Sequence, residues 1–119
     1  MLPEMSPNEL FRLDDRVALI AGGGGAIGAA IGAAFVKAGA KVVLMGHSPS
    51  NTEAAAQRIG ANSLAVVADA TSEQECEAAV AQAVSRFGRL DIVVNAVGGG
   101  AGKVLHNAEE YPRDDWDWI

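Results

Sequence analysis

ALIAGGGGAIGAAIG, residues 18–32, places four consecutive glycines between an apolar run and an alanine-rich stretch with helical periodicity. Glycine costs about 0.5–1 kcal/mol relative to alanine inside a helix or strand, so the run indicates a turn that needs close backbone approach. A turn between a buried strand and a helix presents free backbone N–H groups at the positive end of that helix. The pattern therefore favours phosphate binding at this turn over a flexible surface loop.

The composition excludes several classes of protein. Half of the 119 residues are apolar, enough for one domain with a core, and the net charge of −6 argues against nucleic acid or an anionic membrane as the partner. The single cysteine, Cys76, cannot form an internal disulfide, and the first residues lack the basic start and apolar centre of a signal peptide. We expect a cytoplasmic protein. Since His106 has no second histidine or cysteine at metal-ligand spacing, no metal site is expected.

After an N-terminal arm at residues 1–12, short β-branched runs alternate with longer segments of helical periodicity. The nearly continuous apolar content of the short runs predicts strands that are covered on both faces. The expected strands are 16–22, 41–46, 63–69 and 90–98, and the expected helices are 26–38, 52–59 and 72–88, with another beginning near 112. This alternation is typical of an α/β fold, so we expect a truncated, doubly wound, Rossmann-type parallel sheet over 13–119 with strand order 3-2-1-4.

Two of the expected helices have an apolar face that can be read from the spacing of their residues. Ile27, Ile31, Ala34 and Phe35 recur at helical spacing in the first helix. In the third helix, Val80, Val84 and Phe87 share one face, and its first turn carries Ser72 and Glu75 at the spacing of a capping box.

Three motifs occur in the order and spacing of the short-chain dehydrogenase/reductase family. AGGGGAIG at 21–28 resembles the family pattern T-G-x-x-x-[GA]-x-G, and ADAT at 68–71 resembles D-[VA]-T. GRLDIVVNAVG at 88–98 resembles G-x-[LI]-D-x-[LV]-V-N-N-A-G. The resemblance extends from Phe11 to the C-terminus. It implies transfer of hydride between the nicotinamide of NAD or NADP and an alcohol or ketone.

The resemblance also implies roles for individual residues in binding the dinucleotide. Asp69 would accept a hydrogen bond from the adenine amino group, and its alternative role is that of a helix cap. Asn95 would lie near the nicotinamide-side ribose, and its alternative role is that of a turn residue at the end of a strand. Ala21 and Ala96 stand where the family pattern has threonine and a second asparagine. The full set of expected cofactor-binding residues is Gly22, Gly24, Gly25, Ala26, Ile27, Gly28, His47, Ser48, Asp69, Ala70, Asn95, Ala96 and Gly98.

The segment after the second strand bears on the choice of cofactor. NAD enzymes carry an acidic residue about 20 residues past the glycine turn, where it binds the ribose hydroxyls, and Gly46 stands at that place here. Without a carboxylate to repel a 2′-phosphate, and with His47, Ser48 and Asn51 as donors, the segment favours NADP. It contains no arginine, so NAD stays open.

The chain lacks counterparts of the family's catalytic serine and Tyr-x-x-x-Lys. Its single tyrosine, Tyr111, is followed four positions later by Asp115. We therefore expect the cofactor-binding half of an oxidoreductase, inactive by itself, whose parent forms a homodimer or tetramer. YPRDDWDWI at 111–119 resembles sugar-acid and polyol dehydrogenases. The alternatives are a non-catalytic nucleotide-binding or interaction module and another Rossmann-type enzyme such as a methyltransferase.

Overall fold

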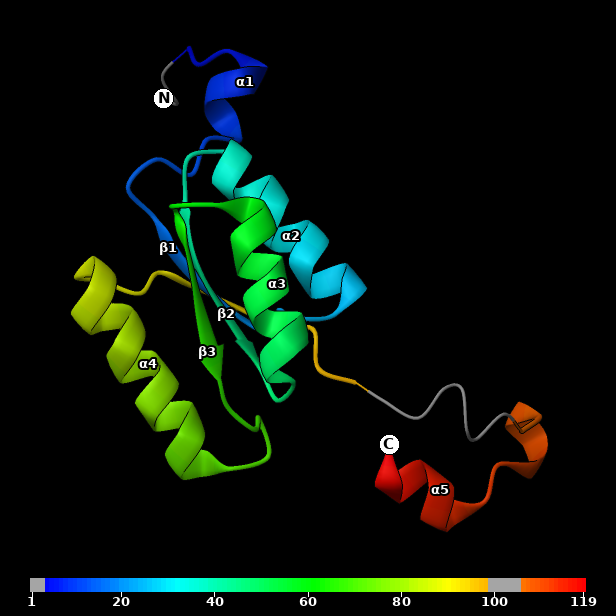
Figure 1. Ribbon diagram of the computed structural model, residues 1–119. Helices are drawn as coiled ribbons and strands as arrows, with labels where there is room; N and C mark the ends of the chain where they lie inside the picture. The colour runs from blue at the N-terminus through cyan, green and yellow to red at the C-terminus, as the bar shows by residue number, and fades with distance from the viewer. Residues whose placement is uncertain (1–3, 99–105) are drawn as a thin grey trace.

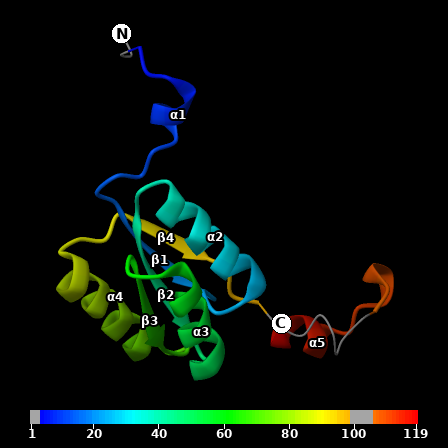
Figure 2. The same cartoon turned by 45° about the horizontal axis from the view of Figure 1, so that its top comes forward.

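A computed structural model describes residues 4–98 and 106–119, and its centre is a parallel sheet. Within the described residues the sheet has four strands in the order β3-β2-β1-β4, which confirms the expected topology. Helices α2 and α3 cover one face of the sheet and α4 covers the other (Figures 1 and 2). The strands are β1 (Val17–Ala21), β2 (Lys41–Gly46), β3 (Ser63–Val67) and β4 (Ile92–Asn95), and the helices are α2 (Ala26–Lys37), α3 (Pro49–Ile59) and α4 (Glu73–Phe87).

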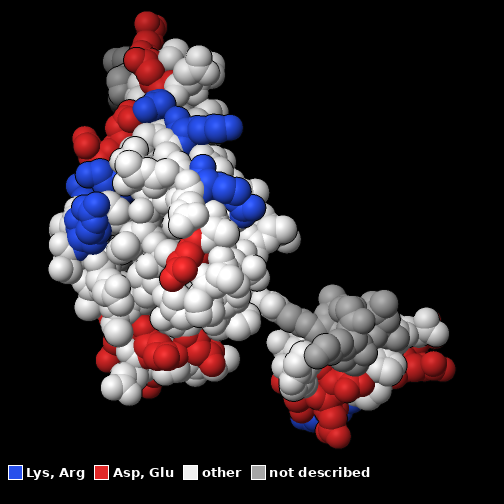
Figure 3. Space-filling model, viewed as in Figure 1, with Lys and Arg blue, Asp and Glu red and all other residues white. Residues whose placement is uncertain are grey.

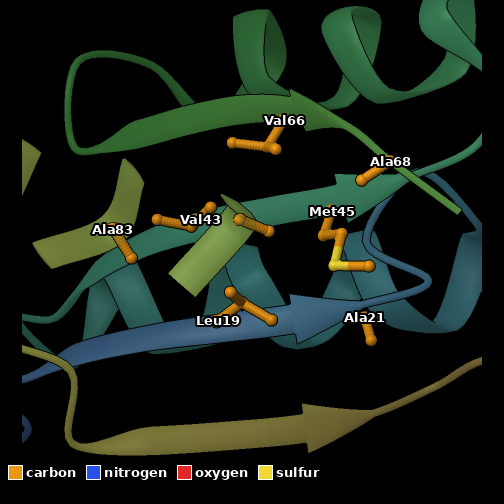
Figure 4. Close-up of a cluster of buried hydrophobic side chains, with 8 residues drawn as sticks. Leu19, Ala21, Val43, Met45, Val66, Ala68 and Ala83 are labelled. Carbon is orange, nitrogen blue, oxygen red and sulfur yellow. The ribbon is translucent and has the colours of Figure 1, made fainter. Parts of the chain in front are cut away.

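Two apolar clusters hold these helices against the sheet. Successive side chains of a strand point to opposite faces, so β1 sends Ile20 toward α2 and α3 and Leu19 toward α4. Figure 4 shows the second cluster, in which Leu19 lies near Val43 and Met45 of β2 and Ala83 of α4. The five residues of β1 are only 0–7% exposed because both faces are covered, and this explains their unbroken apolar run.

The buried face of α4 differs from the one that its valines suggested. Ala79 and Ala83 are fully buried against the sheet, whereas Val80 and Val84 are 40% and 45% exposed. Alanine lets the helix approach the sheet closely, so the small side chains occupy the contact. In α2, similarly, Ile27 at the helix start is 73% exposed.

Serine caps set the starts of α3 and α4. Helix α3 begins at Pro49, three residues before the expected 52, because Ser48 caps it and proline suits the first helical position. Ser72 caps α4 and accepts the Glu75 N–H at 3.3 Å. The Glu75 carboxylate, however, accepts the backbone N–H of Asp69 at 2.8 Å, so the expected capping box is only half formed.

The N-terminal arm contains a short helix, α1 (Pro7–Leu10), that sequence reasoning missed. Ser6 and Glu9 form a complete capping box there, with the Ser6 N–H donating to the Glu9 carboxylate at 2.7 Å. The described residues before Leu13 are exposed, and the Leu13 N–H donates to the Ala38 carbonyl at 2.8 Å, which joins the arm to the end of α2.

The C-terminal described residues form a 3₁₀ helix, η1 (Ala108–Glu110), and helix α5 (Arg113–Trp118). His106 Nε2 lies 2.8 Å from the Asp115 carboxylate, and the Tyr111 ring packs edge-on against both His106 and Trp116. In the described parts of the chain, the helices are all too short or too polar to cross a membrane.

Asp91 links the beginning of β4 to β1. Its carboxylate accepts the Val17 N–H at 2.9 Å and binds the Arg89 guanidinium at 2.7–3.0 Å, and Arg16 Nη1 lies 3.7 Å away. These contacts, the hydrogen bonds from Arg89 above all, hold the pKa of the Asp91 carboxyl below its ordinary value. Within the described residues β4 pairs only with β1, so this carboxylate reinforces its one attachment.

We expect Asp91→Asn to lower the thermal midpoint of the protein at pH 7 and to lower it less in acid. A lowered folded-state pKa stabilises the fold above the unfolded value, about 3.9 for Asp, and this stabilisation is lost as pH falls through the folded value. Thermal unfolding at pH 7 and pH 3 measures both midpoints. Glu53→Gln removes an exposed carboxylate with no ion pair among the described residues and serves as control. A difference between wild type and Asp91→Asn that is the same at both pH values contradicts the role of the carboxylate.

Candidate functional site

The expected site residues gather at the carboxyl end of the sheet, in two adjoining pockets. A pocket of about 450 Å³ is lined by Gly22, Gly24, Gly25, His47, Ser48, Asp69, Ala70, Ala96 and Gly98, among others. A second pocket of about 590 Å³ shares several of these residues and adds Ala26, Ile27, Gly28 and Asn95. The fold thus brings all thirteen to the carboxyl end of the sheet. The strand order reverses there between β1 and β4, which is where open α/β sheets bind ligands.

The glycine turn, residues 22–25, lies between β2 and the segment after β4. Gly22 has a φ of +81°, and a Cβ there would collide with the Ala96 carbonyl. The N–H groups of Gly22 and Gly23 donate to the Met45 carbonyl at 2.9 and 3.0 Å, and Gly25 donates to Gly22 at 3.1 Å. These N–H groups fix the shape of the turn, so a ligand must use the donors that follow them.

Those donors lie at the start of α2. Its N-cap, Gly25, has no side chain to accept a hydrogen bond, and the first N–H with a helical partner is that of Ala29, which donates to the Gly25 carbonyl at 2.9 Å. The N–H groups of residues 26–28 have no acceptor among the described residues, whereas α3 and α4 have serine caps. A helix start of this kind attracts an anion through its free donors and its dipole.

The glycine pattern predicts that Gly28 lets the helix pack close to the sheet, but in the structure Gly28 packs against the glycine turn. A Cβ on Gly28 would collide with the Gly22 carbonyl, so the first turn of α2 and the glycine turn are in backbone contact. Gly32, one helical turn later, is the glycine that lies over the sheet, close to the side chains of Leu44 and Ile20.

The end of β2 contributes polar groups to the smaller pocket. His47 and Asn51 line it, and Ser48 both lines it and caps α3 by accepting the Asn51 N–H at 3.4 Å. Thr52, which sequence reasoning missed, borders the same pocket and donates its hydroxyl to the Ser48 carbonyl at 2.7 Å. Threonine often makes this bond within a helix, but the sequence carries no signal that this one is fully buried.

Asp69 is held in one orientation at the end of β3. Its Oδ1 accepts the N–H and the hydroxyl of Thr71 at 2.8 and 2.7 Å. These hydrogen bonds, the backbone one first, lower the pKa of the Asp69 carboxyl, and the nearby charge of His47 acts in the same direction. Since Ser72 caps α4, Asp69 does not fill the alternative role of helix cap. Its Oδ2 has no partner among the described residues and can accept a hydrogen bond from a ligand.

Asn95 and Ala96, at the end of β4, form one wall of the larger pocket. Asn95 is the last residue of the strand, and its exposed side chain lines the larger pocket, so it is both a strand end and a pocket residue. The Ala96 N–H donates to the Ala21 carbonyl at 2.8 Å. The backbone therefore holds the end of β4 to β1 although Ala96 has no amide side chain.

The described residues of the pockets include a carboxylate and an imidazole but no strongly basic side chain. The described residues that line them include Asp69 and His47 but no lysine or arginine. On the face shown in Figure 3, the Lys and Arg of the sheet domain lie over its upper half, whereas Asp and Glu are spread over the face and gather at its lower end. A phosphate bound here would be held by backbone N–H groups and the helix dipole.

Groups that catalyse acid–base chemistry or bind metal are sparse around these pockets. Tyr111 contacts His106 and Trp116 and lines neither pocket. A cluster of three or more His, Cys, Asp or Glu side chains suited to a metal ion does not occur in the described residues.

Comparison with known proteins places these features in a family context. A family model described as short chain dehydrogenase matches residues 16–119. An uncharacterized oxidoreductase of Mycobacterium tuberculosis is 46% identical over 94 residues, which are 76% of this chain and 36% of that protein. D-threitol dehydrogenase of Mycolicibacterium smegmatis is 39% identical over 120 residues, covering 96% of this chain and 44% of that protein.

A solved structure supports the same comparison. The 3-ketoacyl-(acyl-carrier-protein) reductase of Brucella melitensis, crystallised in complex with NADH, superposes with a TM-score of 0.79 at 40% identity. The match covers 90% of this chain and 43% of that one. The chain thus spans less than half the length of each of these three relatives.

Proposed function

The chain belongs to the short-chain dehydrogenase family, and we propose that it forms the NAD(P)-binding part of an oxidoreductase that acts on an alcohol or ketone. The observation that carries the proposal is the uncapped start of α2, where free N–H groups border both the glycine turn and a pocket. In this proposal residues 13–119 are the partial dinucleotide-binding domain and residues 1–12 are the arm.

The residues present fit a dinucleotide. A Cβ at Gly22 or Gly28 would meet backbone atoms, so glycine at both positions lets the turn pack directly against the helix start that borders the pocket. The N–H groups of residues 26–28 donate to it, and Asp69 accepts from the adenine amino group. Asn95 lines the larger of the two pockets, where it would contact the nicotinamide-side ribose. When bound, the nicotinamide supplies or accepts the hydride.

We further propose NADP as the preferred form of the cofactor. Gly46 offers no carboxylate to repel a 2′-phosphate, and His47, Ser48 and Asn51 line the pocket around it. All three carry side-chain groups that can donate a hydrogen bond to a phosphate oxygen. The imidazole of His47 is the group that would add positive charge when protonated.

The substrate that we propose is a polyol or a related sugar acid. The similarity to D-threitol dehydrogenase covers nearly the whole chain, and the segment 111–119 resembles enzymes of that class. Because these 119 residues include no Tyr-x-x-x-Lys, we propose that they bind cofactor without catalysis and that turnover requires further residues. The full-length protein is proposed to form a homodimer or tetramer.

The test is to titrate the full-length protein with NADPH and with NADH while following nicotinamide fluorescence, and then to assay turnover with D-threitol. We expect NADPH to bind more tightly, by roughly fivefold to tenfold for one added phosphate contact. Tighter binding of NADH contradicts the NADP assignment alone. If neither cofactor binds, the proposed function is contradicted. If a cofactor binds but D-threitol is not turned over, the proposed substrate is contradicted.

A further inference from the structure

Thr52 is the only buried polar residue among those that the structure describes. It lies in the first turn of α3, and the Ser48 carbonyl accepts both its hydroxyl at 2.7 Å and its backbone N–H at 3.0 Å. Thr52 borders the smaller pocket, yet it is 0% exposed. Since its surface does not reach solvent, it can influence a ligand only through the residues that it contacts.

The hydroxyl of Thr52 lies against two glycines that belong to two other elements. A Cβ built on Gly46, at the end of β2, would lie 2.5 Å from Thr52 Oγ1. A Cβ built on Gly24, in the glycine turn, would lie 2.8 Å from the same atom. Both distances are shorter than real Cβ contacts. The hydroxyl of Thr52 therefore fills the space that both glycines leave, where β2, α3 and the glycine turn meet.

We propose that Thr52 is a positioning residue for the dinucleotide, which supports the glycine turn against the end of β2 and makes glycine obligatory at position 46. An acidic side chain at that position would bind the ribose hydroxyls of NAD, but it cannot be placed while the Thr52 hydroxyl occupies the space. Thr52 thereby acts on cofactor selectivity without touching the cofactor. The inference rests on the dinucleotide site proposed above.

The two glycines differ in what the Thr52 hydroxyl contributes to their crowding. Around Gly46, the next Thr52 atom after Oγ1 is Cβ, at an ordinary contact distance of 3.7 Å. Around Gly24, the Thr52 backbone N and Cα remain at 3.1 and 3.2 Å. Removing the hydroxyl therefore makes room for a side chain at position 46 and leaves position 24 crowded.

This difference supplies a matched experiment in the full-length protein. Dissociation constants of NADPH and NADH are measured for Gly46→Ala and Gly24→Ala, each alone and combined with Thr52→Ala, with thermal midpoints as the check on folding. We expect each glycine substitution alone to weaken both cofactors about fivefold or more. Thr52→Ala should restore binding in the Gly46→Ala background to that of Thr52→Ala alone, and should fail to do so in the Gly24→Ala background.

Two further variants separate positioning from a purely structural role. Thr52→Ser keeps the hydroxyl and should bind both cofactors within about twofold of wild type, a conservative rescue. Gly46→Asp with Thr52→Ala should raise the preference for NADH over NADPH about tenfold relative to the isosteric Gly46→Asn with Thr52→Ala, since only the charge differs. A structural role would change the thermal midpoint and leave this ratio unchanged.

The outcomes distinguish the inference from the proposed function. Additive effects of substitutions at positions 46 and 52, or equal rescue at positions 24 and 46, overturn the inference and leave dinucleotide binding intact. An unchanged cofactor ratio in the Asp and Asn pair overturns it as well. A wild-type protein that binds neither cofactor overturns the proposed function and this inference with it.

Discussion

Replacing Gly22 with alanine is expected to abolish dinucleotide binding and to destabilise the full-length protein by about 2–5 kcal/mol. The backbone of Gly22 has a φ of +81°, a left-handed conformation that costs an L-residue about 1–2 kcal/mol. The new Cβ would also run into the Ala96 carbonyl. Because that obstacle is backbone, no change of rotamer relieves the collision, and either the turn or the end of β4 must move. Chemical denaturation and fluorescence titration with NADPH measure the two effects.

Gly88→Ala is the matched control for this substitution. Gly88 has a φ of +84°, nearly that of Gly22, but a Cβ there would meet nothing within 4 Å. The control therefore carries only the cost of the left-handed backbone, about 1–2 kcal/mol, and should bind NADPH as wild type does. If Gly88→Ala loses as much affinity as Gly22→Ala, the loss at Gly22 reflects general destabilisation, and the turn does not have the proposed role.

Gly28→Ala is expected to weaken dinucleotide binding by about tenfold to a hundredfold, the effect of a 1–3 kcal/mol steric cost. Its Cβ would collide with the Gly22 carbonyl oxygen and approach the Gly23 Cα to 3.0 Å. These are backbone atoms of the glycine turn, so the first turn of α2 would have to shift away from it. The N–H groups that we propose for the pyrophosphate lie on that first turn and would move with it. Titration with NADPH and NADH measures the change.

Gly32→Ala tests whether the effect belongs to the helix start. Gly32 lies in the same helix, but its Cβ would meet the side-chain ends of Leu44, Ile59 and Ile20 at 3.0–3.3 Å. These ends can shift by a few tenths of an ångström, and alanine favours the helix by about 1 kcal/mol over glycine. We expect little change in stability and unchanged affinity for both cofactors. Equal loss of affinity in the two variants would place the cause in the packing of α2 and not in its first turn.

Much of the fold was predictable because its signals are local. The apolar run that ends in glycine gave β2 its observed bounds, Lys41–Gly46, and the alternation of strands and helices gave the sheet order. Two further local signals mark helix starts. The serine followed by proline at 48–49 is typical of a helix start, and Ser6 with Glu9 has the spacing of a capping box.

Which of several local options a residue adopts depended on its neighbours in space. Glu75 has capping-box spacing to Ser72, yet its carboxylate bonds to the Asp69 N–H, because β3 delivers that donor to the start of α4. The stripes of alanine and valine on α4 both have helical spacing, and periodicity cannot say which one meets the sheet. The alanines do so because they permit a closer approach.

The sequence by itself determined the family and the fold, since the motifs that specify a glycine turn and strand ends act over a few neighbouring positions. Only the tertiary structure showed that Thr52 fills the space beside Gly24 and Gly46. These three residues belong to α3, the glycine turn and β2, and no spacing in the chain relates them. Their contact arises because parallel strands bring the loops at their carboxyl ends to one edge of the sheet, where packing decides which side chains fit.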